Sequence, residues 1–365
     1  MSEGQELARY TPIDDTHITI VDAIPSRYDD ALTRAGIVAE RVTRSQKFAD
    51  YQQMKAKNTQ LRQQHDLQLF STYLAQMQIT RTADDLYTDA QAWQGMNAGL
   101  LEGFKAWMLK EGYAIGSINI RLATIRKYCE LAHVSGVISA QELAMLKLVK
   151  GYRYSEGRNI DQDRKDRGLS TRVGTKKTAP TPVSTRQALR LKDETTKPLQ
   201  PRTRAHDKLL ETRDALLMCL MIEHALRVSE VVGLDASSIN LEAGTITVYR
   251  QKTYTRDTYE LMPRTREAAQ AYLPLIDQDG PLFTSYQSKR ITRYGIFERV
   301  RLLGKQVGIE NLSPHDLRHF WTIDAFKNGN GIDLIQRYGG WNSPAMPLHY
   351  ARVIGVANKG LKISQ

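Results

Sequence analysis

The chain has 365 residues, of which 41% are hydrophobic and 25% are charged, as in an ordinary globular protein of one to three domains. Its formal net charge of +11 favours a polyanionic partner, with DNA or RNA first and an acidic membrane surface second. Charge alone does not separate these partners from a protein that is basic only for solubility.

Cysteine usage and hydropathy exclude two further classes of protein. The two cysteines, Cys129 and Cys219, each lie in an apolar helical stretch, which indicates a reducing compartment and excludes a disulfide framework. No apolar run reaches membrane-spanning length, and MSEGQELARY does not have the form of a signal peptide. We therefore expect a cytoplasmic, nucleoid-associated protein without a membrane partner.

The N-terminal half of the chain predicts a polar extension followed by a helical domain. Residues 1–54 form the extension, whose role is not predicted, with a possible strand at 16–24 and a short helix at 27–42. Residues 55–150 carry apolar residues at helical spacing in four segments, which predict a small helical domain. The four segments are 60–77, 98–114, 117–139 and 141–152.

Basic residues in the third predicted helix are candidates for DNA contact. Arg121, Arg126 and Lys127 could touch phosphates, although each could equally be a solvated surface charge.

A basic interval separates this domain from the C-terminal one. Residues 151–209 contain 15 Lys and Arg against 7 Asp and Glu, and show little apolar periodicity. TRVGTKKTAPTPVS within it predicts an extended linker, which could lie along a DNA backbone or serve as a tether.

Residues 210–365 predict an α+β domain. LETRDALLMCLMIEHAL is apolar on all sides and predicts a buried helix, while TITVYR and TYELMP predict two strands joined as a hairpin by QKTYTRD. Further helices follow. The predicted fold class is therefore mostly α, with an all-helical domain and an α+β domain that contains a small antiparallel sheet.

The stretch SPHDLRHFW, residues 313–321, concentrates chemistry-bearing side chains. Ser313 is a good N-cap and Pro314 suits the first helical position, so a helix is predicted to begin here. His315 then shares a face with Arg318 and His319. A helix N-terminus also favours anions, because its free N–H groups and dipole are positive.

A zinc site is the alternative for this stretch. HDLRH has the two-histidine spacing of H-E-x-x-H, but Asp316 replaces the glutamate and no convincing third ligand follows. An arginine one turn from His315 is unfavourable beside a metal. It is favourable beside a phosphate, because its planar guanidinium can donate to two phosphate oxygens at once. A purely structural helix would be the default for HDLRH by itself.

Other segments add single residues with ordinary alternatives. In HALRVSEVVGL, Arg227 interrupts an apolar pattern and Glu230 lies three residues on, which taken alone predicts a surface ion pair. Lys252 lies in the predicted hairpin turn, where lysines are usually solvated. GGWNSPAMPLHYARV supplies two glycines that allow close backbone approach, with Trp341 and Tyr350, which elsewhere are most often core residues.

The order of these residues resembles that of the tyrosine recombinase (phage integrase) family. The resemblance rests on A-L-R-V-S-E, a lysine in a β-hairpin, H-D-L-R-H, and a Cre-like G-G-W followed by a tyrosine at the family's spacing. It covers residues 210–352 and extends to 55–150, which is similar to the family's helical core-binding domain. Trp341 stands where most members carry histidine, and Pro347 where most carry threonine.

The resemblance implies a mechanism and roles for individual residues. Tyr350 would attack the scissile phosphate to give a 3′-phosphotyrosine, without a metal or ATP. Arg227 and Arg318 would clamp the phosphate oxygens. Lys252 would be the general acid for the leaving 5′-oxygen, and His315 a general base or phosphate donor. Trp341 would donate its indole N–H to the phosphate. In support, Glu230 would orient Arg227 or His315, and His319 would brace the helix from behind.

The implied partners are double-stranded DNA with specific recombination sites and further copies of the chain. Exchange between two duplexes needs four cuts, so a homotetramer is expected, with possible accessory proteins; the last residues after Tyr350 could pack on a neighbouring protomer. Integration, excision and resolution stay open. The alternatives are a type IB topoisomerase or telomere resolvase with the same chemistry, a DNA-binding relative with a decayed site, and the zinc hydrolase.

Overall fold

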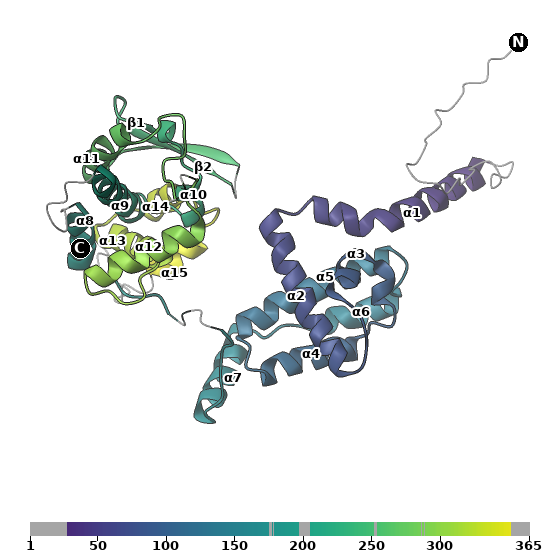
Figure 1. Cartoon of the computed structure of the whole chain (residues 1–365). Helices are drawn as coiled ribbons and strands as arrows, with labels where there is room; N and C mark the ends of the chain where they lie inside the picture. Colours follow the sequence, from purple (N-terminus) through teal and green to yellow (C-terminus); the bar gives the residue numbers. More distant parts are fainter. Residues whose placement is uncertain are drawn as a thin grey trace, which may run out of the picture. The chain divides into compact units, whose positions relative to one another are not determined.

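The computed structural model describes residues 28–174, 177, 179–196, 205–251, 254–285, 287 and 289–351. The chain divides at Thr175 into two compact units (Figure 1). Each unit has its own hydrophobic core. The strand predicted at residues 16–24 lies outside the described residues. Among the described helices, none is both long enough and apolar enough to cross a membrane.

The first unit is entirely helical over its described residues. The four predicted helices are present, and the helix predicted at 27–42 is longer than expected. Two short elements between the first and second predicted helices were not anticipated. The elements are α1 Tyr28–Gln53, α2 Lys57–Gln76, α3 Ala83–Thr88, η2 Ala90–Trp93, α4 Ala98–Lys110, α5 Ile115–Val134, α6 Ala140–Leu148 and α7 Tyr154–Asp166.

Aromatic side chains fill the core of the first unit. Phe70 lies at its centre, with ring centroids 5.0 Å from Phe104 and 6.0 Å from Trp93. Trp93 stacks in turn on Tyr128 of α5 at 5.9 Å. Trp93 comes from η2, a segment without helical periodicity of its own. Burying its indole stabilises the unit by several kcal/mol, at roughly 25 cal/mol per Å². This burial holds η2 against the core.

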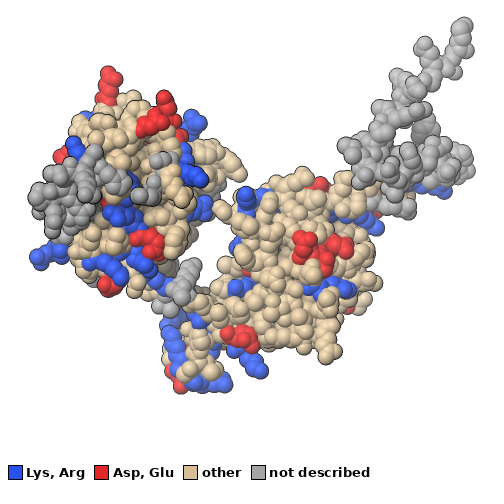
Figure 2. Space-filling model, viewed as in Figure 1, with Lys and Arg blue, Asp and Glu red and all other residues tan. Residues whose placement is uncertain are grey.

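The interval 151–209 contains two helices where an extended basic linker was predicted. α7 belongs to the first unit, and Figure 2 shows both basic and acidic side chains in this region. α8 Thr185–Thr196 packs against α9 in the second unit, burying Leu191. The prediction missed α8 because only one of its faces is apolar and its many charges mask the pattern.

The second unit surrounds one buried helix, as the sequence predicts. α9 Ala205–Glu223 contacts α8, α11 and α13, and residues 215–222 are all buried. A three-stranded antiparallel sheet, in the order β1-β2-β3, lies in the same unit. The elements after α9 are α10 Val228–Val232, η3 Ala236–Ser238, β1 Ile239–Asn240, β2 Thr245–Arg250, β3 Thr255–Glu260, α11 Pro263–Tyr272, η4 Leu273–Leu275, α12 Arg293–Gln306, α13 Pro314–Lys327, α14 Ile332–Gly339 and α15 Ala345–Ala351.

The predicted hairpin is confirmed, with one change of register. β2 pairs with β3 so that Arg250 faces Thr255, which places the second strand three residues earlier than predicted. Ile246, Val248 and Arg250 on alternate positions of β2 are buried, while Tyr249 is exposed. An arginine thus occupies a core-facing position of the sheet, and the functional site explains why.

Candidate active site

Arg227 begins a short helix that follows the buried helix α9. α9 ends at Glu223, and the chain turns through Ala225, whose φ of 51° lies in the left-handed region that non-glycine residues seldom adopt. Arg227 is the N-cap of α10. The buried Glu230 carboxylate accepts both the backbone N–H and the guanidinium of Arg227 at 2.7 Å. The pair is therefore a helix cap as well as an ion pair, and it fixes the direction of the Arg227 side chain.

The helix that carries H-D-L-R-H begins at the predicted residue. Ser313 is the N-cap of α13, and its N–H and hydroxyl donate to the Asp316 carboxylate at 2.8 and 2.7 Å. Two residues that precede α8 hold the same carboxylate: Lys177 donates to it at 2.6 Å and the Thr181 N–H at 2.9 Å. Asp316 is thus used within the protein, and part of the predicted linker anchors this helix.

Arg318 points inward from α13 and is 5% exposed. Its two terminal nitrogens donate to the carbonyls of Ala225 and Gly339, and its guanidinium carbon lies 4.2 Å from the ring centroid of Trp341. Burial, and after it the positive charge of Arg227, lower the pKa of Arg318 to about 9. The charged form is therefore under strain, which an anion bound beside the two arginines would relieve.

The two glycines of G-G-W allow close approach, as predicted. A Cβ on Gly339 would lie 1.9 Å from the ring of Trp341, and one on Gly340 would lie 2.1 Å from Nη1 of Arg250. Gly340 also has a φ of 61° and ends α14 as its left-handed C-cap. The turn can approach the Trp341 ring and the Arg250 guanidinium this closely only because positions 339 and 340 carry no side chain.

Tyr350 lies in α15 and is 2% exposed. The ring of His319 meets it edge-on with centroids 4.5 Å apart, and the ring of Trp341 lies 6.1 Å away. Burial raises the pKa of Tyr350, while Arg318 and Arg227 oppose that rise. The phenol is therefore protonated at neutral pH, and the two cations favour its anion. Pro347 falls in the first turn of α15, where a backbone N–H has no helical partner to lose.

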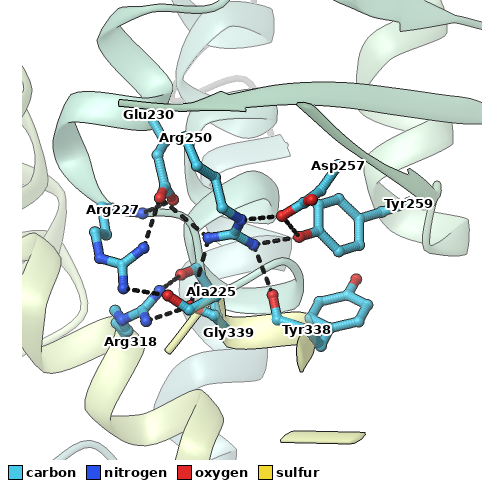
Figure 3. A network of polar contacts seen from close by, with 10 residues as sticks. Ala225, Arg227, Glu230, Arg250, Asp257, Tyr259, Arg318, Tyr338 and Gly339 are labelled. Atoms are coloured by element: carbon cyan, nitrogen blue, oxygen red, sulfur yellow. Dashed lines mark hydrogen bonds and ion pairs between the residues drawn. The ribbon is translucent and has the colours of Figure 1, made fainter. Parts of the chain in front are cut away.

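A buried arginine that the sequence analysis did not select joins these elements. Arg250 bonds to Glu230, to Asp257 and Tyr259 of β3, and to the carbonyls of Tyr338 and Gly339 (Figure 3). Burial alone would lower the pKa of Arg250, but the Tyr259 hydroxyl and the carboxylates more than offset it, so that the pKa is raised.

Not every predicted residue falls in this cluster. The structure brings together Arg227, Glu230, Arg318, His319, Trp341 and Tyr350. His315 lies in the first turn of α13, and its side chain is exposed. Glu230 bonds to Arg227, one of its two predicted partners, and to Arg250. His319 meets Tyr350 directly, a different place from the brace behind the helix that was predicted. Lys252 lies outside the described residues, although the hairpin on either side of it is present.

The three basic residues of α5 lie in the first unit, and each has a partner there. Arg121 lies over the ring of Tyr113, with its guanidinium carbon 4.6 Å from the centroid. Arg126 donates to the Val149 carbonyl at 3.3 Å, and Lys127 pairs with Glu130 at 3.1 Å.

Sequence reasoning missed Arg250 and the histidine before Ala225. The buried His224 bonds through Nδ1 to the Tyr338 hydroxyl at 2.9 Å, and burial lowers its pKa to about 4. The available signal for Arg250 was its core-facing position in the alternation of TITVYR, a charge at a place where the pattern demands an apolar residue.

The arrangement suits a phosphodiester and an oxygen nucleophile. Three guanidinium groups and two carboxylates meet in the network of Figure 3, which leaves an excess of one positive charge in a largely buried place. Arginine donors directed at one point stabilise charge that develops on phosphate oxygens. Over the described ranges, no group of three or more His, Cys, Asp or Glu is placed to hold a metal ion.

Comparison with known proteins agrees with this geometry. The model of the phage integrase family matches residues 184–354, the part of the chain that holds the whole cluster. A tyrosine recombinase XerC of Pseudomonas syringae pv. syringae is 28% identical over 217 residues, which are 58% of this chain and 69% of the relative. A XerC of Azotobacter vinelandii is 26% identical over 249 residues, 67% of this chain and 72% of the relative.

Among solved structures, the integrase of transposon Tn1549 in complex with transposon right end DNA superposes with a TM-score of 0.57. It covers 84% of this chain and 94% of that chain at 13% identity, and so bears on the fold. The family match and these relatives show a tyrosine recombinase that breaks and rejoins DNA strands. Residues 184–354 belong to the phage integrase family, and the relatives named above are tyrosine recombinases. The expected family and the expected fold class are thereby confirmed.

Proposed function

We propose that this tyrosine-type site-specific recombinase cuts each strand through Tyr350. The phenol oxygen attacks the scissile phosphate, a 3′-phosphotyrosine forms, and the 5′-oxygen leaves with a proton. The phosphodiester energy stays in the covalent bond, so rejoining by another 5′-hydroxyl needs neither ATP nor a metal. The observation that carries this proposal is a buried tyrosine beside two arginines whose donors converge, with Arg318 strained by burial.

Arg227 and Arg318 supply the phosphate clamp in this proposal. Their donors are directed at the Gly340 and Gly339 carbonyls, which are oxygen acceptors at neighbouring positions of one turn. Phosphate oxygens are stronger acceptors, and their negative charge grows in the transition state. The arginines would then exchange one or more carbonyl partners for phosphate, which also relieves the cost of the buried charge on Arg318.

The other residues have narrower proposed roles. His315 accepts the phenol proton or donates to a phosphate oxygen, Lys252 protonates the leaving oxygen, and the Trp341 indole N–H binds the phosphate. Glu230 orients Arg227, with which it already shares two hydrogen bonds. We propose that His319 keeps the Tyr350 ring in place through their edge-to-face contact, because burial and the nearby His315 lower its pKa and leave it neutral.

The proposed substrate is duplex DNA with specific recombination sites, bound in the reducing environment of the cytoplasm. In support, the related integrase of transposon Tn1549 is in complex with transposon right end DNA. For this chain we propose four protomers on two duplexes, with Arg121, Arg126 and Lys127 on phosphates of the flanking arm. Residues after Tyr350 would pack on a neighbouring protomer. Unchanged assembly on DNA after deletion of residues 354–365 would exclude this role of the tail.

Covalent trapping tests the proposed chemistry directly. Nicked duplexes from the DNA flanking the gene are incubated with the protein in excess EDTA, and a denaturing gel detects the protein–DNA adduct. Tyr350→Phe removes only the nucleophilic oxygen. Tyr294→Phe, on an exposed side chain of α12, is the matched control. We expect an adduct with the wild type and with Tyr294→Phe, and none with Tyr350→Phe.

Other outcomes distinguish the alternatives. An adduct that survives Tyr350→Phe would assign the nucleophile to another tyrosine. Loss of the adduct in EDTA would exclude the metal-independent mechanism. Tight DNA binding without an adduct on any duplex would favour a non-catalytic relative. Relaxation of supercoiled plasmids that share no site, without recombination, would favour a type IB topoisomerase.

A further inference from the structure

Arg250 is the last residue of β2 and one of the most deeply buried charged side chains of the second unit, with 2% of its surface exposed. It follows Ile246 and Val248 on the core-facing side of the strand. A buried cation costs several kcal/mol unless every donor finds an acceptor. The sheet would be more simply built with an aliphatic residue here, so the contacts of Arg250 must be specific ones.

The donors of Arg250 are all directed at protein acceptors. Nε donates to Asp257, Nη1 to Glu230 at 3.1 Å and to the Gly339 carbonyl at 3.4 Å, and Nη2 to the Tyr338 carbonyl at 2.8 Å and to the Tyr259 hydroxyl. These are five bonds, and a guanidinium has five N–H groups. Arg250 therefore has no donor left for a phosphate, which separates it from Arg227 and Arg318.

Two acceptors of Arg250 are shared with the proposed clamp. The Glu230 oxygen that accepts Arg250 also accepts Arg227 at 2.7 Å. The Gly339 carbonyl that accepts Arg250 also accepts Arg318. Each clamp arginine is thus one shared oxygen away from Arg250 (Figure 3). This sharing of acceptors requires an arginine, because only its planar guanidinium can donate to a carboxylate and to two successive carbonyls at once.

The turn before Trp341 is shaped around the same guanidinium. Gly340 adopts a φ of 61°, and a Cβ there would lie 2.1 Å from Nη1, 2.3 Å from Cζ and 2.7 Å from Nε of Arg250. The second glycine of G-G-W is therefore required by Arg250 as much as by the helix C-cap. Because Trp341 follows directly and stacks on Arg318, the position of the turn also fixes the Trp341 ring.

We infer that Arg250 is a positioning residue for the phosphate clamp: by holding Glu230 and the Tyr338–Gly340 turn, it sets the directions of Arg227 and Arg318. This inference rests on the proposed function. It assigns Arg250 to transition-state stabilisation and gives it no contact with DNA. Its loss should therefore slow cleavage while leaving the affinity for DNA almost unchanged.

The test compares Arg250→Lys and Arg250→Met with the wild type in single-turnover cleavage of nicked duplex at saturating protein. Arg250→Lys keeps the charge and loses the fork. We expect both to cleave roughly 10- to 100-fold more slowly, as is typical when a supporting partner of a site is lost. Tyr259→Phe removes only one acceptor of Arg250 and should give a smaller decrease. Because it keeps the guanidinium and the apolar core, slower cleavage by this variant would not come from unfolding caused by the loss of Arg250.

Arg164→Met is the matched control. Arg164 is another buried arginine, 5% exposed, which donates to the carbonyls of Tyr113 at 3.2 Å and Ser170 at 2.5 Å in the first unit. Its loss should lower the thermal stability without slowing cleavage at saturating protein. An equal slowing by Arg164→Met would mean that any buried arginine has this effect, and would overturn the specific role.

Two further measurements test the route of the effect. If Arg250 acts through Arg227, the defects of Arg250→Met and Arg227→Lys should not add in the double variant. A substrate with sulfur as the bridging 5′ atom has a leaving group that needs no proton, because a thiol is far more acidic than an alcohol. This substrate should restore Lys252→Met and not Arg250→Met.

Additive defects, restoration of Arg250→Met by the sulfur substrate, or wild-type cleavage by the Arg250 variants would each overturn the inference and leave the Tyr350 mechanism standing. Absence of an adduct with the wild-type protein would instead remove the proposed function, and this inference with it.

Discussion

The two compact units of the chain are held together by different kinds of interaction. In the first unit, the interior is dominated by stacked and edge-to-face aromatic rings around Phe70. The second unit has an apolar core and, beside it, a buried polar network. In this network three arginines bond to two carboxylates and to backbone carbonyls. Apolar contacts are non-directional and tolerate small shifts, whereas hydrogen bonds fix angles. The first interior is suited to stability, and the second to holding donors at defined positions.

Loss of an aromatic ring from the first unit should give the largest effect on stability. Phe104→Ala removes a fully buried ring that contacts Phe70, and should lower the free energy of unfolding by about 3–5 kcal/mol. Chemical denaturation followed by tryptophan fluorescence measures this, because Trp93 and Trp107 lie in the same unit. Ile120→Ala, on an exposed side chain of α5, is the control and should change it by less than about 0.5 kcal/mol. Cleavage of saturated DNA should be preserved while Phe104→Ala remains folded.

Loss of a clamp arginine should give the reverse pattern. Arg318→Met should slow adduct formation about 10²–10³-fold, about 3–4 kcal/mol in barrier, because a donor to the developing charge is lost. Its cost in unfolding free energy should be smaller than that of Phe104→Ala, since replacing a buried charge by an apolar side chain removes its desolvation penalty. The lowered pKa of Arg318 reports that penalty. If Arg318→Met destabilises the protein as much as Phe104→Ala, the network is mainly structural and the contrast fails.

Acid should destabilise the second unit through His224. The pKa of His224 is lowered to about 4 by burial, so the unfolded chain takes up a proton first as the pH falls. The stability contributed by the neutral ring is complete above pH about 6.5 and is lost as the pH falls towards about 4, by about 3 kcal/mol in total.

His224→Gln should flatten this part of the stability profile, measured by denaturation between pH 7 and 4. Tyr338→Phe keeps the histidine and removes its hydroxyl partner, so its profile should retain the slope. A slope unchanged by His224→Gln would assign the acid sensitivity to other groups.

A surface charge of the first unit should give the smallest effect, and on binding alone. Lys127→Ala should reduce the salt dependence of DNA affinity by about one unit of slope if Lys127 contacts a phosphate. Its ion pair with Glu130 is half-exposed and its ammonium lies 5.4 Å from the centroid of the Tyr51 ring, so stability should fall by no more than about 1 kcal/mol. Glu130→Ala breaks the same pair and keeps the lysine, so the slope should not fall. An unchanged slope in Lys127→Ala would remove this residue from the proposed DNA interface.

The sequence by itself determined the helices of the first unit, the buried helix α9, the hairpin and the start of α13 at Ser313. These depend on local periodicity and on caps, which act within a few residues. It also determined the family, because the order of arginine, lysine, H-D-L-R-H, G-G-W and tyrosine resembles that of the tyrosine recombinases, and the family model matches the residues that carry this order.

Only the tertiary structure decided which groups meet. Arg250, Tyr338 and His224 are far apart in sequence and have no motif of their own, and their burial depends on how β2, α14 and the end of α9 pack. The anchoring of Asp316 by Lys177 was equally invisible, since it joins residues 139 apart. Backbone carbonyls accept most of the bonds that aim the arginines, and every residue has one. Only the path of the folded chain selects those of Ala225, Tyr338, Gly339 and Gly340.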